Sequence, residues 1–274
     1  MSNIVAMALC RIKDSKNLEY NKDTGADNTY TLYSSMCEIL CESADRFIPG
    51  DWEFEIIENE VDNYQQIFDT NFNEVYEMWD GGKNNILFLD LDTFIINTVD
   101  VFDKLEHFQM FNYTDPKTLS GKDANNKYGL QHEHYLNAGV RYYPKTMSQD
   151  VWDLGWKYAN DWDYDIWGTE QIIFNEMMYS ENKDVHNWLD PNMNYQMMNA
   201  VPELLDNPNY ISQLNTWNNT QLNNAKIVHL HGTRGAEQTL LTQVALWKKP
   251  TGEDFEFDQS VINDQVRVEY KLCT

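Results

Sequence analysis

Basic residues are scarce in this 274-residue chain. Lys and Arg number 20 against 44 Asp and Glu, and the formal net charge is −24. A chain of this charge repels phosphate backbones and anionic lipid surfaces, which argues against a nucleic-acid partner and against attachment to a membrane surface. An anionic ligand is compatible with this charge where a metal ion or a local Arg or Lys offsets the surrounding carboxylates.

Long apolar runs are also missing. No stretch reaches the ~18 to 20 consecutive apolar residues of a membrane span, and the first residues, Met1 to Ala6, lack the basic segment of a secretion signal. We therefore predict a cytoplasmic protein without a membrane span. Hydrophobic residues nevertheless make up 42% of the chain, which is enough to build a folded core.

Cysteine is rare, and none of the four cysteines belongs to a C-x-x-C pair. Cys37 and Cys41 lie four residues apart on an apolar stripe, which is the spacing of one helix face. We predict that the cysteines are reduced and buried, because free cysteine behaves as a small hydrophobic residue.

Apolar runs and amphipathic stretches alternate along the first third of the chain. Short apolar or alternating runs predict strands, and apolar residues at steps of three and four predict helices. The predicted strands are 4–9, 52–57 and 86–89, and the predicted helices between them are 33–47 and 68–79. This order is typical of an α/β fold with a Rossmann-like, mostly parallel sheet and helices on both faces.

The rest of the chain predicts further elements of the same fold. Apolar runs at 108–111 and 136–143 and a strand at 227–231 accompany helices over about 149–158 and 170–179. The segment 13–28 is polar and predicts a loop. No internal repeat or long linker interrupts the chain, so we expect one domain over 1–274 with an irregular C-terminal part.

Two carboxylates follow directly on the strand 86–89. Asp90 and Asp92 are two residues apart, so both side chains point to one side at the carboxyl edge of the sheet, where open α/β sheets bind ligands. Neighbouring carboxylates repel each other unless a divalent cation lies between them. The motif predicts a metal site, and the alternative is that Asp92 caps a helix and Asp90 is solvated.

His229 and His231 lie on one face of the late strand. Two imidazoles on one face suit a transition metal better than Mg²⁺, and together with Asp90 and Asp92 they favour Mn²⁺. The pattern predicts that the two aspartates and one of the two histidines, His229 or its rival His231, bind the metal.

Two further polar groups interrupt apolar segments. Asn137-Ala138-Gly139 lies within the predicted strand 136–143, where a glycine marks a close approach of backbone or ligand, or else a bulge. Gly168-Thr169-Glu170-Gln171 opens a helix, in which Thr169 would be the N-cap and Glu170 a partner of the helix dipole. The spacing of these residues does not by itself show that either segment binds a ligand.

In this order, the segments resemble the GT-A glycosyltransferases, and most closely the glycogenin-like retaining group (family eight). The matching segments are Ile86 to Asp92, Leu136 to Val140, Glu170-Gln171 ahead of a helix with Asn175, and Ile227 to Gly232. The resemblance implies one nucleotide-sugar-dependent catalytic domain, with a nucleotide-binding half at 1–92, a sugar and acceptor half at 93–249 and an extension at 250–274. It also implies that Mn²⁺, or Mg²⁺, is held against the donor's pyrophosphate.

The same resemblance assigns roles to individual residues. Asp90 and Asp92 match the D-x-D pair, and His229 matches the late histidine because two residues separate it from Gly232. The implied contacts with the donor are Ala8, Leu9, Arg11, Asp90, Leu91, Asp92, Asn137, Ala138, Gly139, Gly232 and Arg234.

Two assignments bear on the reaction itself. Glu170 and Gln171 match the catalytic position beside the anomeric carbon. Arg234 stands where the family usually has Lys-Pro-Trp after the late histidine motif, and its planar guanidinium suits a pair of pyrophosphate oxygens.

The activity that the resemblance implies is transfer of a hexose from a UDP-sugar to the hydroxyl of an unidentified acceptor, with retention. Negative charge develops on the leaving diphosphate in such a reaction, and a metal ion stabilises it. In an inverting enzyme Glu170 would deprotonate the acceptor, whereas retention requires no strong base.

Two other functions fit parts of the sequence. Asp90-Leu91-Asp92-Thr93 also resembles the Asp-x-Asp-x-Thr motif of Mg²⁺-dependent haloacid-dehalogenase-like phosphohydrolases, in which Asp90 would be the nucleophile and Asp92 the acid and base. That motif usually lies near the N-terminus, and no late Gly-Asp-x-x-x-Asp follows it here. The second alternative is a non-catalytic glycan-binding module, which has no need to hold a metal.

Overall fold

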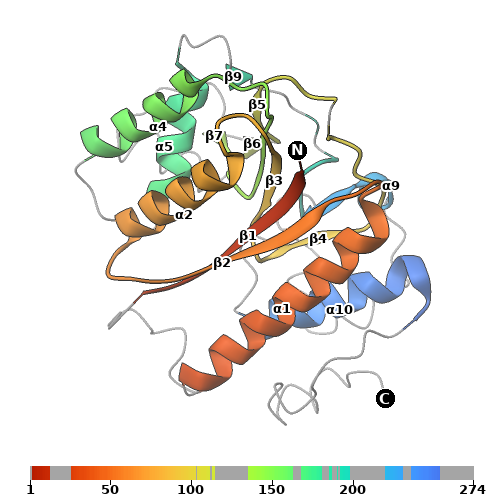
Figure 1. Cartoon of the computed structure of the whole chain (residues 1–274). Coiled ribbons are helices and arrows are strands. Elements are labelled where there is room, and N and C mark those ends of the chain that lie inside the picture. Colours follow the sequence, from red (N-terminus) through yellow and green to blue (C-terminus); the bar gives the residue numbers. More distant parts are fainter. Residues whose placement is uncertain are drawn as a thin grey trace. The chain divides into compact units, whose positions relative to one another are not determined.

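The computed structural model describes residues 2–12, 26–102, 104–111, 113–114, 135–162, 168–180, 185–186, 190, 192–197, 220–230 and 236–253 (Figure 1). The chain divides into two compact units. The first unit comprises Met1–Asp14, Gly50–Asp90 and Asp100–Met193, and the second comprises Ser15–Pro49, Leu91–Val99 and Asn194–Thr274. One of the crossings between them falls directly after Asp90, so the Asp90-Leu91-Asp92 segment belongs to both.

A six-stranded sheet forms the centre of the first unit. Its strands are β1 (Asn3–Ile12), β2 (Glu53–Val61), β3 (Asn85–Leu89), β5 (Phe108–Met110), β8 (Val140–Tyr143) and β9 (Val185–His186), in the spatial order β2-β1-β3-β8-β5-β9. All neighbours are parallel except β8, which is antiparallel to both β3 and β5. The predicted α/β class with a mainly parallel sheet is confirmed.

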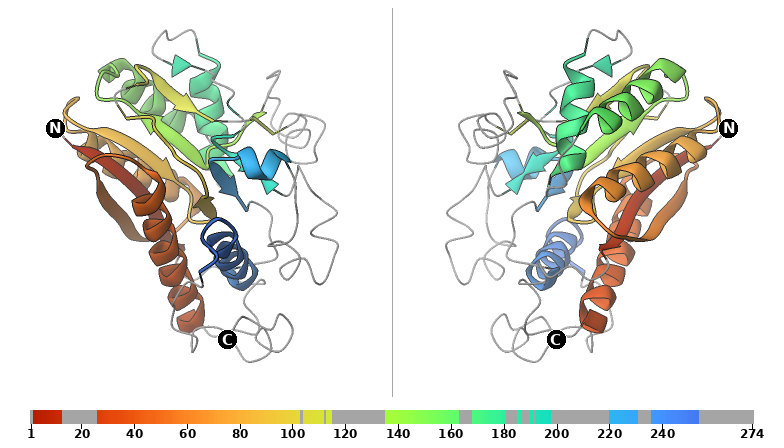
Figure 2. Two further views of the ribbon diagram at one scale, coloured as in Figure 1. Left: turned by 90° about the vertical axis from the view of Figure 1, so that its right-hand side faces the viewer. Right: turned by 90° about the vertical axis from the view of Figure 1, so that its left-hand side faces the viewer.

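Three helices of the first unit pack together over one face of this sheet (Figure 2). They are α2 (Tyr64–Trp79), α4 (Gln149–Asp161) and α5 (Thr169–Met178). Their aromatic side chains meet in one core, in which Phe72 lies between Phe68 and the fully buried Trp152. The packing is close, since a Cβ at Gly155 would lie 2.3 Å from the Phe72 ring.

The second unit has a smaller sheet and its own helices. Its strands are β4 (Thr93–Ile95), β10 (Tyr195–Gln196) and β11 (Ile227–His229), in the order β10-β11-β4, with β11 parallel to β10 and antiparallel to β4. The helices are α1 (Ala26–Phe47), α9 (Thr220–Asn224) and α10 (Ala236–Thr251). Helices α1 and α10 lie side by side (Figure 1), and their core includes Met36, Ile39 and Leu240.

Three sequence predictions are wrong about backbone structure. The segment 136–143 is not one strand, because β7 (Tyr135–Leu136) ends before a turn and pairs with β6 (Tyr113–Thr114), while β8 begins at Val140. Residues 26–28 open α1 instead of belonging to a loop, in keeping with the preference of Asp and Asn for a helix start. Helix α10 was not expected at all, and residues 254–274 of the predicted extension lie outside the described residues.

The cysteine prediction holds in part. Cys37 and Cys41 are both free, and Cys37 is buried, but Cys41 is only half-buried. Burial, and then the nearby carboxylates of Glu42 and Asp45, raise the pKa of the Cys41 thiol. Cys10 and Cys273 have side chains outside the described residues.

None of the helices in the described ranges has the length and apolar content that crossing a membrane requires. The predictions that helices cover both faces of the main sheet and that residues 1–274 form a single catalytic domain stay predictions.

Candidate active site

The Asp90-Leu91-Asp92 segment is fixed by backbone hydrogen bonds at both ends. The Asp90 N–H donates to the carbonyl of Gly139 at 2.7 Å, within the first unit. The Asp92 carbonyl accepts from the Leu230 N–H at 2.8 Å, within the second unit. The first bond continues the antiparallel register of β3 with β8, and the second continues that of β4 with β11, so both ladders extend into this segment.

A buried glutamine on α10 supports the same segment. The Gln243 side chain is fully buried, and its Nε2 donates to the carbonyls of Leu91 at 3.0 Å and Thr93 at 2.8 Å. One amide therefore holds the backbone on both sides of Asp92. Sequence reasoning missed this role because α10 itself was not expected.

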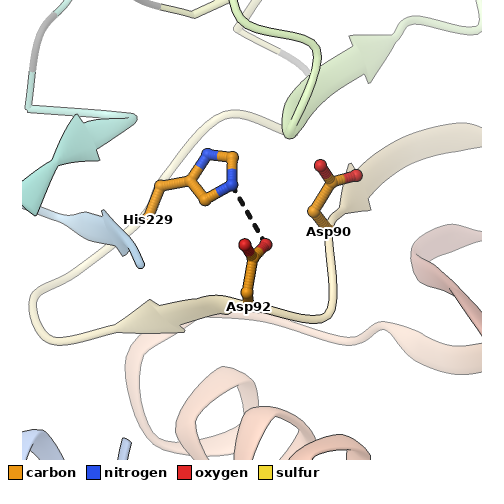
Figure 3. Close-up of side chains that lie close together, drawn as sticks. All are labelled: Asp90, Asp92 and His229. Carbon is orange, nitrogen blue, oxygen red and sulfur yellow. Dashed lines mark ion pairs between the residues drawn. The ribbon is translucent and has the colours of Figure 1, made fainter. Parts of the chain in front are cut away.

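Asp92 contacts His229 inside the second unit (Figure 3). In the antiparallel pairing of β4 with β11, His229 stands opposite Thr93, the residue that follows Asp92. His229 Nε2 lies 3.0 Å from Asp92 Oδ1; the imidazole is buried, whereas the carboxylate is partly exposed. The pair thus has one side that solvent or a ligand can reach.

Asn194 sets the orientation of the His229 ring. Its buried side-chain oxygen, Oδ1, accepts a hydrogen bond from His229 Nδ1 at 3.1 Å. With Nδ1 as the donor, Nε2 faces the Asp92 carboxylate and can hold either a proton or a metal ion there. Such outer partners are what fix the tautomer of metal-binding histidines in general.

Three ligand atoms meet at this point. One carboxylate oxygen each from Asp90 and Asp92 and one imidazole nitrogen of His229 all lie within 4.8 Å of one another (Figure 3). Two carboxylates and an imidazole are a donor set that fits a divalent cation such as Mn²⁺ or Mg²⁺. The rival ligand His231 lies outside the described residues, as do Gly232 and Arg234.

The hydroxyl of Tyr33, on α1, is affected by the negative charge of Asp92. Burial, and secondly the negative charge of Asp92, raise the pKa of the Tyr33 hydroxyl. The phenol therefore stays protonated at neutral pH and keeps its capacity to donate a hydrogen bond. No sequence motif pointed to Tyr33.

In the first unit, the turn 137–139 is tied to the start of α5. Gln171 Oε1 accepts hydrogen bonds from Asn137 Nδ2 at 3.2 Å and from the Ala138 N–H at 3.3 Å. Asn137 Oδ1 accepts from the Gly139 N–H at 2.9 Å, which closes the turn. The predicted sugar-lining turn and the predicted catalytic glutamine are thus in direct contact.

Asn175, one turn further along α5, holds the strand that leads into this turn. Its Oδ1 accepts from the Leu136 N–H at 2.7 Å, and its Nδ2 donates to the carbonyls of Leu136 at 2.8 Å and Gln171 at 2.7 Å. The helix does not use Thr169 as its N-cap, because Gly168 occupies that position with a φ of 92° and no side-chain cap is formed.

Glu170 pairs with a buried arginine that sequence reasoning missed. Arg141 Nη1 lies 2.6 Å from Glu170 Oε1, and the side chains are 1% and 23% exposed. Burial by itself would lower the pKa of the Arg141 guanidinium, but the negative charges of Glu170 and Asp90 raise it above its usual value. The sequence does contain a signal for this role, because Arg141 is a charged residue inside the otherwise apolar stretch 140–143.

The described residues do not test the remaining predicted contacts with the donor. Ala8 is half-buried and Leu9 is buried in β1, while the side chain of Arg11 lies outside the described residues. Leu91 packs against the apolar core of the second unit. A nucleotide base site at this strand stays a prediction.

Comparison with known proteins gives distant structural likeness. No family model and no curated protein matches the chain. The chain is similar to a glycosyltransferase involved in glycosylation of the major capsid of PBCV-1, with 13% identity, a TM-score of 0.47, and coverage of 89% of this chain and 98% of that one. It is similar to the bifunctional glycosyltransferase WbbM, with 10% identity, a TM-score of 0.48, and coverage of 90% and 51%. It is also similar to the galactosyltransferase LgtC in complex with donor and acceptor sugar analogues, with 11% identity, a TM-score of 0.49, and coverage of 97% and 99%.

Proposed function

We propose that this chain is a metal-dependent glycosyltransferase. It moves a hexose from a nucleoside-diphosphate sugar, UDP-hexose in our proposal, to an acceptor hydroxyl with retention of configuration. The observation that carries the proposal is the group of Asp90, Asp92 and His229, with ligand atoms within 4.8 Å of one another directly after a buried strand. We further propose that the protein works in the cytoplasm.

In this proposal, a metal ion offsets the negative charge at the site. A nucleoside diphosphate carries negative charge, and so do the two aspartates and the chain as a whole at −24. Asp90, Asp92 and His229 would hold Mn²⁺ or Mg²⁺, with His229 oriented by Asn194. The bound cation supplies Lewis acidity toward the leaving diphosphate. In this proposal, Gly232 and Arg234 add contacts to the pyrophosphate, and Ala8, Leu9 and Arg11 lead to the base.

The chain's own residues would place the sugar. Asn137, Ala138 and Gly139 form a turn that Gln171 and Asn175 hold in place through amide hydrogen bonds. Such a rigid turn offers polar groups to sugar hydroxyls with little loss of side-chain freedom on binding. Glu170, whose carboxylate is partly exposed, and Gln171 lie beside the turn and would face the reacting carbon.

The direct test is release of nucleoside diphosphate from a panel of UDP-, GDP- and ADP-hexoses, with Mn²⁺, with Mg²⁺ and with EDTA. We expect one donor to turn over with metal and none with EDTA, and we expect the Asp92→Asn variant to lack this turnover. The Asp100→Asn variant is the matched control, because Asp100 is an exposed residue paired with Lys104. Failure of every donor to bind or turn over with metal would contradict the proposal.

The same assay separates the other functions. Phosphate release from a phosphomonoester, with a phosphoryl group trapped on Asp90, would assign the chain to the phosphohydrolases. Binding of glycans without metal-dependent turnover of any donor would assign it to the binding modules.

A further inference from the structure

Arg141 is a buried charged residue that lies against two aromatic rings. It lies on β8, is 1% exposed, and its guanidinium carbon is 4.1 Å from the centre of the Phe88 ring and 4.3 Å from that of the Phe174 ring. The flat guanidinium is thus held between two rings. A buried charge in such a place is costly unless it is paired, and an apolar replacement of similar volume is often no less stable. Stability of the fold alone does not account for this arginine.

The partner of Arg141 lies at the edge of the buried region. Glu170 offers Oε1 to Arg141 Nη1 at 2.6 Å and is 23% exposed, so its carboxylate is anchored on the inside and accessible on the outside. The second carboxylate oxygen, Oε2, belongs to the same planar group and is a further hydrogen-bond acceptor. Arginine suits this task because its planar fork loses little freedom on pairing.

The anchored carboxylate adjoins the turn 137–139. Gln171, the next residue on α5, bonds Asn137 and Ala138, and the Gly139 carbonyl accepts the Asp90 N–H at 2.7 Å. The arginine, the glutamate and the turn therefore form one network within the first unit. The turn is the segment that we propose lines the sugar.

We infer that Arg141 is a positioning residue for the donor sugar: it holds Glu170 in the one orientation in which that carboxylate accepts a hydrogen bond from a hydroxyl of the hexose. This inference rests on the proposed function and names the part of the donor that the network recognises. Arg141 itself, being buried, does not touch the sugar.

The test compares a nucleotide sugar with the nucleoside diphosphate alone. The donor found in the panel above and its diphosphate are titrated, with Mn²⁺, onto the wild type, Arg141→Met and Glu170→Gln. We expect each variant to lose about tenfold to a hundredfold in affinity for the nucleotide sugar and nothing for the diphosphate, since a charge-assisted hydrogen bond to the sugar is lost. The double variant should lose no more than either single one, because the two residues act as a unit.

Arg46→Met is the matched control. Arg46 also lies over an aromatic ring, that of Trp247 at 4.6 Å, and near a carboxylate, Glu253 at 3.5 Å, but outside this network. It should keep wild-type affinity for both ligands. Arg141→Lys restores the charge and should recover part of the affinity for the nucleotide sugar.

Three results would overturn the inference. One is wild-type affinity of Glu170→Gln for the nucleotide sugar, a result that stands even where Arg141→Met does not fold. Another is an equal loss of affinity for diphosphate and nucleotide sugar, which is what a merely structural role would produce. If the wild type binds no nucleotide sugar at all, the proposed function fails first, and the inference fails with it.

Discussion

The two ends of the Asp90-Leu91-Asp92 segment are stabilised in different ways. Asp90 donates its N–H to Gly139 in the first unit, and its negative charge helps to raise the pKa of Arg141. Asp92 accepts from Leu230 in the second unit, and its carboxylate contacts an imidazole. One aspartate is thus near a fixed positive charge, whereas the other faces a nitrogen that can bind a cation.

From this difference we infer that the two proposed functions of the site, metal binding and sugar binding, have separate supports. Asn194 and Gln243 support the Asp92 end, and we expect changes there to alter metal binding. Asn175 supports the turn 137–139, and Arg141 supports the Glu170 carboxylate. We expect changes at these two residues to alter binding of the sugar. Variants at each end should therefore separate the two properties.

The largest effect is expected for loss of the Asp92 charge. Asp92→Asn should lower metal-dependent turnover of the nucleotide sugar by about a thousandfold, because a Lewis-acid metal contributes several kcal/mol to such a reaction. Initial rates with Mn²⁺ check this, with Asp100→Asn as the control. Turnover within tenfold of the wild type would remove Asp92 from the metal site.

Asn175→Leu should have the next largest effect. It leaves the N–H and carbonyl of Leu136 without their side-chain partner in a buried place, and we expect unfolding in urea to require about 3 kcal/mol less. Where the variant folds, its affinity for the nucleotide sugar should fall and its affinity for Mn²⁺ should not. Loss of Mn²⁺ binding with an intact sugar site would reverse the roles assigned to the two ends.

Gln243→Met breaks the other support. Its amide bonds two carbonyls, and removing it should lower the free energy of unfolding by about 2 kcal/mol and also weaken Mn²⁺ binding, because the backbone around Asp92 loosens. Gln149→Met on the exposed side of α4 is the control and should stay within about 0.5 kcal/mol of the wild type. Unchanged Mn²⁺ affinity in a destabilised Gln243→Met protein would limit this glutamine to a structural role.

The smallest effect is expected at Asn194. Asn194→Leu removes the acceptor of the His229 Nδ1 bond, and Mn²⁺ affinity should fall about tenfold, as it does when outer partners of metal ligands are lost. Asn194→Asp keeps an acceptor oxygen and should retain the affinity. Equal Mn²⁺ binding by the leucine variant and the wild type would show that the ring needs no such partner.

The three residues of the candidate metal site could be singled out because their signals in the sequence are local. A fully buried run of five residues, β3, ends at Asp90, and the late strand carries His229 on an apolar background. The mostly parallel sheet follows from the same alternation of strands and helices. The sequence could not show which late side chain contacts Asp92, and the 3.0 Å distance between His229 Nε2 and Asp92 Oδ1 does.

The features that the sequence did not reveal have both local and distant causes. The turn 137–139 interrupts an apolar run because the Asn137 side chain bonds the Gly139 N–H, a local bond that competes with strand pairing. Helix α10 buries three polar residues, Thr239, Thr242 and Gln243, so its apolar period is blurred. The roles of Arg141 and Asn194 appear only once their partners on other elements are known.

The central claim is that Asp90, Asp92 and His229 together bind a divalent cation. Its most direct test is electron paramagnetic resonance of Mn²⁺ titrated into the wild type, Asp92→Asn and Asp100→Asn, each with UDP present and each compared with the same concentration of UDP alone. We predict that the free Mn²⁺ signal falls with one equivalent of the wild type and of Asp100→Asn, and that Asp92→Asn leaves it unchanged. Equal loss of the signal with all three proteins, or no loss with any, would contradict the claim.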